Sequence, residues 1–194
     1  MARDIPQAPV VTTVGAPTSL WQRLLAGFFR LVLQLLFKPL VRPPFPLAWQ
    51  RQIARLLSSI TLAESGLDIG RMSDVACGGE VIRSPLGEVD GAVLYLHGGA
   101  FCMGSPLSHR SITTYLASRS RSEVWVPDYR LAPEHPAPAA LEDAVSCYRR
   151  MLMAGFCADQ IVIAGDSAGA GLALSTVLKL RELEYIQAAQ AFGV

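Results

Sequence analysis

The feature that most constrains the fold of this 194-residue chain is a set of short apolar runs that alternate with segments of helical length. Residues 92–96 (AVLYL), 124–127 (VWVP) and 161–165 (IVIAG) have the length and composition of buried strands. The predicted helices that follow them cover residues 108–118, 138–154 and 168–184. Strands that are apolar throughout and separated by helices form a mostly parallel sheet with helices on both faces. The sequence therefore predicts an α/β fold.

The chain upstream of these runs divides into segments of different character. Residues 1–19 contain three prolines and show no periodicity, which predicts a disordered lead. Residues 20–66 are predicted to form amphipathic helices, and residues 67–194 are predicted to form the α/β core. Within that core, residues 72–83 predict two short strands joined at Gly78-Gly79.

The first amphipathic helix, within residues 20–40, has a broad apolar stripe opposite a narrow basic one. Its longest charge-free stretch, residues 31–37, is far shorter than the ~18–20 apolar residues of a membrane span. We favour a helix that packs over a hydrophobic site. The alternative is a peripheral membrane contact through residues 20–40, which vesicle flotation would test. The apolar stripe of this helix consists of Trp21, Leu24, Leu25, Phe28, Leu31, Val32, Leu35 and Leu36, and that of the second helix of Trp49, Ile53, Leu57 and Ile60.

The composition excludes several classes of protein. With 51% hydrophobic and 17% charged residues and a net charge of +1, the chain is neither disordered nor suited to nucleic acid, which requires a clustered basic face. The N-terminus does not have the pattern of a signal peptide. The four cysteines show no metal-binding or disulfide spacing, so we expect reduced thiols and a cytoplasmic location.

The strongest local motif is Gly165-Asp166-Ser167-Ala168-Gly169, a G-x-S-x-G sequence between a predicted strand and a predicted helix. In such a turn the serine takes a strained conformation and projects into an open site, while the glycines let strand and helix cross closely. Ser167 is therefore a candidate nucleophile, with Gly165, Asp166 and Gly169 as supporting residues. Its place at a helix N-terminus directs backbone N–H groups toward developing negative charge. The alternative is a glycine-rich turn with a capping serine.

A second motif, His97-Gly98-Gly99-Ala100-Phe101, directly follows the AVLYL strand. In a parallel sheet its loop leaves from the same edge as the loop that carries Ser167. Residues without bulky side chains let backbone N–H groups approach an oxyanion, so Gly98, Gly99 and Ala168 are candidate donors of an oxyanion hole. Ala100 remains an alternative donor, because the sequence does not decide which loop amides point inward. His97, at the strand end, is expected to orient this loop.

These motifs resemble the hormone-sensitive-lipase-like esterases of the α/β-hydrolase superfamily. The resemblance covers about residues 72–183 and rests on HGGAF at 97–101, DYRLAPEHPAPAALEDA at 128–144 and GDSAGAGLAL at 165–174. It implies a carboxylesterase that forms an acyl-enzyme on Ser167 with small or medium acyl esters, without metal or cofactor, under a cap built partly from N-terminal helices. Ala100 replaces the third glycine of the family's HGGG. By resemblance, the scaffold beneath the site includes Asp128, Glu134, His135 and Asp143.

The catalytic triad of this fold follows the chain order Ser, Asp or Glu, His. After Ser167 the sequence has no aspartate or histidine, and its only acids are Glu182 and Glu184. Glu182 lies some 20 Å along the predicted helix from the nucleophile, too far to orient a base. His135 has no local residue that would direct it toward Ser167. We therefore expect a C-terminally truncated chain without the triad Asp and His, which is inactive or weak alone.

Two consequences follow from such a truncation. The 161–165 strand would form an apolar sheet edge, which favours self-association. The missing base also motivates an alternative function, that of a non-catalytic pseudo-hydrolase that binds a partner or a membrane surface.

Overall fold

The computed structural model describes residues 19–32, 34–35, 46–58, 63–72, 77–85 and 89–183. The chain divides into two units, Met1–Phe45 and Pro46–Val194. The described part of the first unit contains helix α1 (Leu20–Val32), which has no buried residue. It confirms the first part of the helix predicted within residues 20–40. The predicted lead, up to residue 18, lies outside the described residues.

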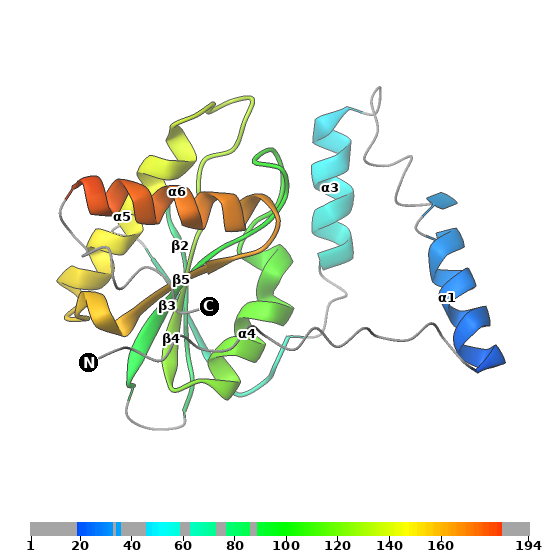
Figure 1. Cartoon of the computed structure of the whole chain (residues 1–194), viewed down its shortest axis with the longest axis horizontal. Helices are drawn as coiled ribbons and strands as arrows, with labels where there is room; N and C mark the ends of the chain where they lie inside the picture. Colours follow the sequence, from blue (N-terminus) through cyan, green and yellow to red (C-terminus); the bar gives the residue numbers. More distant parts are fainter. Residues whose placement is uncertain are drawn as a thin grey trace, which may run out of the picture. The chain divides into compact units, whose positions relative to one another are not determined.

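The second unit contains a five-stranded sheet with strand order β1-β2-β4-β3-β5 (Figure 1). The central strand β4 (Ser122–Pro127) and the last strand β5 (Ile161–Gly165) both pair in parallel with β3 (Gly91–Leu96). The first two strands, β1 (Asp68–Arg71) and β2 (Gly79–Arg83), extend the sheet in antiparallel pairing. The three apolar runs of the sequence are thus confirmed as the parallel strands.

The prediction of two strands joined at Gly78-Gly79 is wrong in its boundaries. The first strand lies earlier, and Asp68 pairs with Arg83. Gly79 starts β2 instead, with a φ of 142°, and a Cβ atom there would overlap the Val126 carbonyl oxygen of β4. The glycine pair therefore marks a close approach between β2 and β4, which a sequence pattern does not distinguish from a tight hairpin turn.

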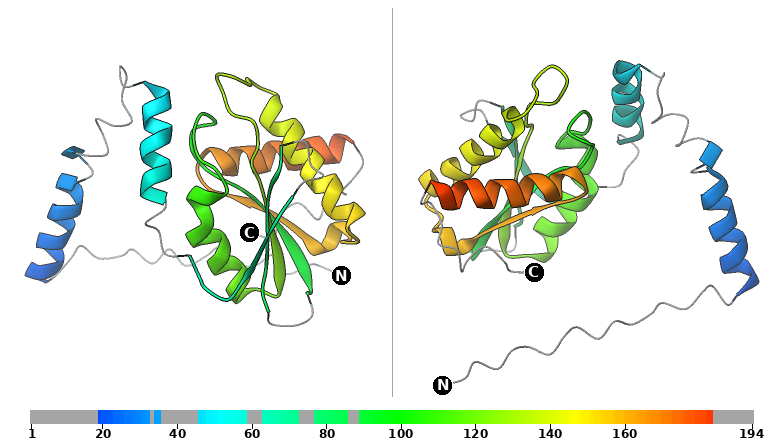
Figure 2. Two further views of the ribbon diagram at one scale, coloured as in Figure 1. Left: turned by 180° about the vertical axis from the view of Figure 1, so that it is seen from behind. Right: turned by 45° about the horizontal axis from the view of Figure 1, so that its top comes forward.

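Helices cover both faces of the sheet (Figures 1 and 2). Helices α5 (Ala139–Met153) and α6 (Ala168–Glu182) pack over one face, where Leu94 and Leu96 of β3 belong to their core cluster. Helix α4 (Arg110–Arg119) covers the other face, where Tyr95 lies in a second cluster. Alternate residues of β3 thus contribute to two cores, as a central strand buried on both faces requires. These three helices confirm the helices predicted from the sequence.

Helix α3 (Leu47–Ser58) is the second predicted amphipathic helix. Its expected apolar face is not uniformly buried, because Trp49 is 62% exposed. Ile60 and the side chain of Leu57 lie outside the described residues. Two short 3₁₀ turns, Leu107–His109 and Ala158–Gln160, precede α4 and β5. Within the described residues, no helix has the length and apolar character that crossing a membrane requires.

Two glycines of α6 give a matched test of the contact between this helix and the sheet. A Cβ atom at Gly169 would overlap the carbonyl oxygens of Leu96 and His97, whereas a Cβ atom at Gly171 would meet no atom within 4 Å. We expect Gly169→Ala to lower the free energy of unfolding by about 1–3 kcal/mol through overpacking. Gly171→Ala should raise it by about 0.5–1 kcal/mol, because alanine restricts the unfolded chain and favours the helix. Urea unfolding of both variants measures the difference, and equal effects would contradict the close contact.

Candidate active site

The two predicted site loops leave the sheet side by side. Strands β3 and β5 are parallel neighbours, and Leu96 pairs with Gly165 at their carboxyl ends. His97 and Asp166 are therefore the first residues of two adjacent loops. The carboxyl ends of parallel strands are where open α/β sheets form their sites.

Ser167 occupies the sharp turn between β5 and α6. Its backbone has φ 51° and ψ −121°, a conformation that L-residues rarely adopt, and its side chain does not cap the helix. The two flanking glycines permit this turn, because a Cβ atom at Gly165 or Gly169 would overlap the Leu96 carbonyl oxygen. The structure thus confirms the strained strand-to-helix turn that the sequence predicts, and Ser167 is exposed at its apex.

The carboxylate of Asp166 connects the serine turn to the glycine loop. Its Oδ1 atom accepts hydrogen bonds from the Gly98 N–H and from the Tyr95 hydroxyl, both at 2.9 Å. The His109 Nε2 atom lies 3.5 Å from the same oxygen. Burial, together with the hydrogen bond to Asp166, raises the pKa of Tyr95, so its phenol remains a donor. A single carboxylate oxygen therefore holds three segments together beside the candidate nucleophile.

This contact corrects one of the sequence candidates for the oxyanion hole. Because the Gly98 N–H already donates to Asp166, it is not free to bind an oxyanion in this arrangement. Within the described residues, the N–H groups of Gly99, Ala100 and Ala168 donate no hydrogen bond. The candidate set therefore becomes Gly99, Ala168 and Ala100, the alternative that the sequence left open. The role of the Gly98 amide depends on a contact with a residue 68 positions away, which no local pattern reveals.

The glycine loop has an unusual backbone. Gly99, Ala100 and Phe101 all have positive φ, at 128°, 53° and 60°. The N–H groups of Cys102 and Met103 both donate to the Gly99 carbonyl oxygen, at 3.0 and 2.9 Å, which closes the loop into a tight turn. Positive φ is costly for residues other than glycine, so this loop depends on the contacts that surround it.

His97 supports the loop from below and is fully buried. Its ring stacks on Tyr129 at 4.1 Å between centroids and on His109 at 5.3 Å, and the Tyr129 hydroxyl donates to the His97 carbonyl oxygen at 2.6 Å. Its Nδ1 atom lies 2.9 Å from the Gly98 carbonyl oxygen, which can only accept, so Nδ1 carries the proton. Burial lowers the pKa of His97 to about 4, which keeps the ring neutral near pH 7. His97 therefore contacts the loop that it is predicted to orient.

His109 is a residue of this site that sequence reasoning missed. It precedes α4, its Nδ1 atom lies 2.9 Å from Ser108 Oγ, and its Nε2 atom faces Asp166. No local motif marks it, because its contacts with Asp166 and His97 join it to other segments of the chain. The other histidine, His135, has an exposed side chain in the loop before α5.

The acidic residues of the middle motif lie in the scaffold. Asp143 is buried and accepts hydrogen bonds from the backbone N–H and the guanidinium of Arg130. Glu134 pairs with Arg51 at 2.7 Å, and burial raises the pKa of Asp128. In the described part of the chain, no group of three His, Cys, Asp or Glu residues is placed to hold a metal ion.

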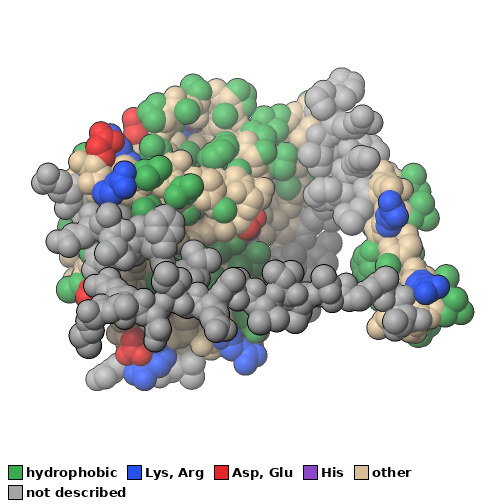
Figure 3. All heavy atoms as spheres, viewed as in Figure 1, with side chains coloured by type: hydrophobic (Ala, Val, Ile, Leu, Met, Phe, Trp, Pro, Cys, Tyr) green, Lys and Arg blue, Asp and Glu red, His purple; other side chains and the backbone are tan. Residues whose placement is uncertain are grey.

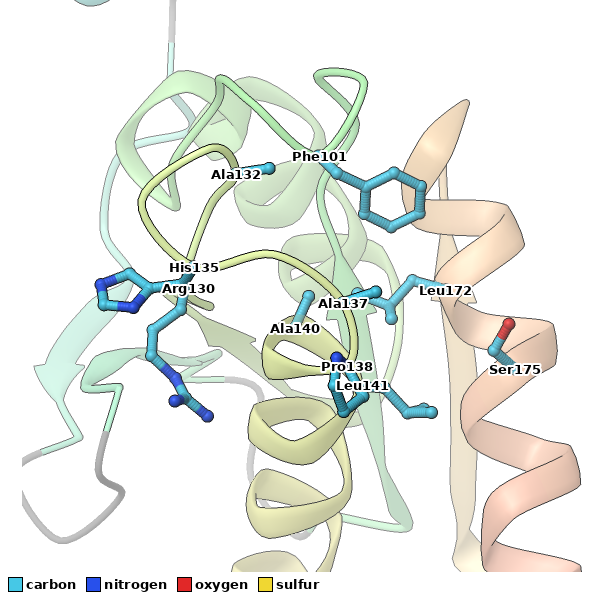
Figure 4. Close-up of a pocket in the computed structure, with 10 residues that line it drawn as sticks. All are labelled: Phe101, Arg130, Ala132, His135, Ala137, Pro138, Ala140, Leu141, Leu172 and Ser175. Carbon is cyan, nitrogen blue, oxygen red and sulfur yellow. The ribbon is translucent and has the colours of Figure 1, made fainter.

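An apolar pocket of about 310 Å³ lies between the glycine loop, the start of α5 and α6 (Figure 4). Phe101 connects the pocket to the glycine loop, because it belongs to that loop and also lines the pocket. Its ring points toward α6 in the close-up. The other lining residues are Arg130, Ala132, His135, Ala137, Pro138, Ala140, Leu141, Leu172 and Ser175.

Comparison with known proteins agrees with this geometry. Residues 93–192 match the family described as alpha/beta hydrolase fold. The acetyl-hydrolase of Streptomyces hygroscopicus is 43% identical over 106 residues, which cover 55% of this chain and 35% of that protein. The putative acetyl-hydrolase LipR of Mycobacterium tuberculosis is 35% identical over 148 residues, which cover 76% of this chain and 48% of that protein.

Solved structures give the same result. An esterase/lipase from an uncultured bacterium and a hormone-sensitive lipase from a metagenome library each superpose with a TM-score of 0.73 and 34% identity. The matches cover 82% of this chain and 53% and 52% of the two structures. The chain belongs to the α/β-hydrolase family, among its hormone-sensitive-lipase-like members. It spans about half the length, or less, of these relatives.

The neutral, buried His97 predicts how stability depends on pH. Its pKa in the folded protein is about 4, below the ordinary value of 6.5, so the unfolded chain binds the proton more readily between these values. Stability is therefore lost as the pH falls from 6.5 toward 4, by up to about 1.4 kcal/mol per pH unit. We expect urea unfolding at about pH 7 and about pH 5 to show this slope, and His97→Asn to remove it. The exposed His135, changed to Gln, is the control, and an unaltered slope in His97→Asn would contradict the prediction.

Proposed function

We propose that this protein is a serine ester hydrolase in which Ser167 is the nucleophile. The observation that carries the proposal is the position of this exposed serine, in a strained turn at the N-terminus of α6 and beside the glycine loop. The backbone N–H groups of Gly99, Ala100 and Ala168 are the proposed oxyanion donors. The relatives named esterase, lipase and acetyl-hydrolase support the same class of reaction.

The proposed reaction has two steps. Ser167 Oγ attacks the ester carbonyl carbon, and the carbonyl oxygen becomes an oxyanion. The bond to the alcohol oxygen then breaks, and the alcohol leaves with the proton that the serine hydroxyl has lost. Water then attacks the acyl-Ser167 and releases the acid. The positive end of the α6 dipole and the loop amides stabilise the oxyanion, since they are fixed before the charge develops. The apolar pocket beside Phe101 favours small or medium acyl groups as substrates.

The described residues supply no base for this serine. His97 is enclosed in its aromatic stack, and His109 faces Asp166. No hydrogen bond joins the Ser167 hydroxyl to a histidine in the part of the chain that the structure describes. A serine without a base is a poor nucleophile near neutral pH. We therefore infer that this chain alone hydrolyses esters slowly, through its oxyanion and binding contacts.

Hydrolysis of p-nitrophenyl butanoate tests the proposal. The purified chain should be slower than a complete triad enzyme by orders of magnitude, because oxyanion and binding contacts alone supply an acceleration on the order of 10³–10⁴ over water. The wild type should also form an acyl adduct on Ser167, detected as a mass increase that Ser167→Ala abolishes, whereas the turnover rate should change little, because the residual acceleration does not use the serine. Ser118→Ala, which changes an exposed serine of α4, is the matched control. A wild type without an acyl adduct, or an adduct that Ser167→Ala retains, would refute the assignment of the nucleophile.

A second candidate function, binding another chain, is favoured by the edge of the sheet. In the described residues β5 pairs only with β3, and Val162 of this strand is 53% exposed. Apolar side chains also gather on the face of the molecule where α6 lies (Figure 3). Leu174 and Leu178 of this helix are 50% and 48% exposed. An unprotected apolar edge strand favours pairing with another polypeptide.

Self-association through this edge predicts an average mass in sedimentation that rises with protein concentration. Val162→Lys should return the protein to a monomer, because a charged lysine on an edge strand opposes strand addition. Val89→Lys is the matched control, since Val89 is also exposed but lies outside the strands. A wild-type protein that is monomeric at all concentrations would argue against this function.

A further inference from the structure

Arg51 is the residue of α3 that connects this helix to the proposed active site. Its Nε atom donates to the Cys102 carbonyl oxygen at 2.7 Å, and a terminal nitrogen donates to the Ala132 carbonyl oxygen at 2.8 Å. The guanidinium also forms a bidentate pair with the Glu134 carboxylate, at 2.7 and 2.8 Å. One side chain therefore joins α3, the glycine loop and the loop that precedes α5.

Polar contacts of Arg51 contribute to the attachment of α3. Trp49 and Leu56 are 62% and 66% exposed, whereas the Arg51 side chain is only 22% exposed. The pair with Glu134 is itself partly exposed, and exposed ion pairs contribute little to stability. The hydrogen bonds to the two carbonyl oxygens are specific to the planar fork of a guanidinium, which presents several donors in fixed directions.

The carbonyl groups that Arg51 binds belong to residues that are hydrogen-bonded to the strained part of the glycine loop. Cys102 follows Phe101, and the Cys102 N–H donates to the Gly99 carbonyl oxygen to close the turn. The Ala132 N–H donates to the Phe101 carbonyl oxygen at 2.8 Å, so Ala132 links Arg51 to the loop a second time. A loop with positive φ at Ala100 and Phe101 persists only where its surroundings determine it.

We propose that Arg51 is a positioning residue of the oxyanion loop: by holding the Cys102 and Ala132 carbonyl groups, it keeps the Gly99 and Ala100 N–H groups in place beside Ser167. Its effect on catalysis rests on the proposed ester hydrolysis, whereas its effect on the loop does not. Arg51 joins helix α3 to the glycine loop, so a displacement of α3 loosens the loop.

Hydrogen exchange followed by mass spectrometry tests the effect on the loop. In Arg51→Met, the Cys102 and Met103 amides should exchange about tenfold faster than in the wild type, because the turn opens locally more often. Arg51→Lys, which keeps the charge but not the fork, should give an intermediate rate. Arg55→Met is the matched control, since Arg55 lies one turn along α3, is exposed and makes no hydrogen bond to the loop among the described residues.

Amides of β4 (Ser122–Pro127) report global unfolding in the same experiment. Faster exchange confined to the loop supports the proposal. Unchanged exchange at Cys102 and Met103 would overturn it, and so would faster exchange that is equal in the loop and in β4, since Arg51 would then serve overall stability only.

The effect on catalysis is measured by the rate at which a p-nitrophenyl alkylphosphonate labels Ser167, detected as a mass increase that Ser167→Ala abolishes. Arg51→Met should label several-fold more slowly than wild type and Arg55→Met, because the phosphoryl oxygen needs the same donors as an ester oxyanion. Equal labelling rates with a loosened loop would overturn the positioning role. Failure of the wild type to label, with a loosened loop in Arg51→Met, would contradict the proposed hydrolysis but support the role of Arg51 in the loop.

Discussion

The carbonyl oxygen of Leu96, at the end of β3, lies very close to the backbone of Gly165 and Gly169. A Cβ atom at either glycine would overlap this oxygen. This close approach lets β5 turn directly into α6 against the neighbouring strand. Ser167 is placed at the apex of the turn and held at positive φ because the residues on both sides of it are packed against backbone. A strained backbone of this kind persists only where the surrounding structure holds it, and here the contacts of Gly165 and Gly169 with the backbone of β3 hold it.

Asp166 adds a polar connection to this backbone contact. Its Oδ1 atom accepts hydrogen bonds from the Gly98 N–H and the Tyr95 hydroxyl, and the His109 ring lies beside it. The Gly98 N–H is thus used for a structural hydrogen bond, and the Gly99 and Ala100 N–H groups remain as proposed donors to the oxyanion. His97, neutral and stacked beneath the loop, supports it without introducing a charge near the proposed oxyanion. The geometry of the donors therefore depends on groups that do not touch a substrate.

The sequence predicted the parts of this structure that local patterns determine. The strand 161–165, the following helix and the strained Ser167 all lie within one short segment, and they were found from apolar runs and glycine spacing. The boundaries of β1 were not found, because a glycine pair looks the same in a hairpin and at a close approach. The occupied Gly98 amide and the contacts of Arg51 were also missed, since they join residues 51 to 83 positions apart. Such contacts leave no local period in a sequence.

In the proposed function, the described residues form the part of a hydrolase site that binds and polarises a carbonyl group. Two residues near Ser167 already have structural roles: Asp166 holds the glycine loop, and Gly169 packs against β3. The histidines near the loop are also engaged, His97 in a buried stack and His109 beside Asp166. A base for the proposed reaction therefore has to be a group other than these two engaged histidines. The positions of the proposed nucleophile and oxyanion donors therefore do not depend on the base, and their geometry can be tested without it.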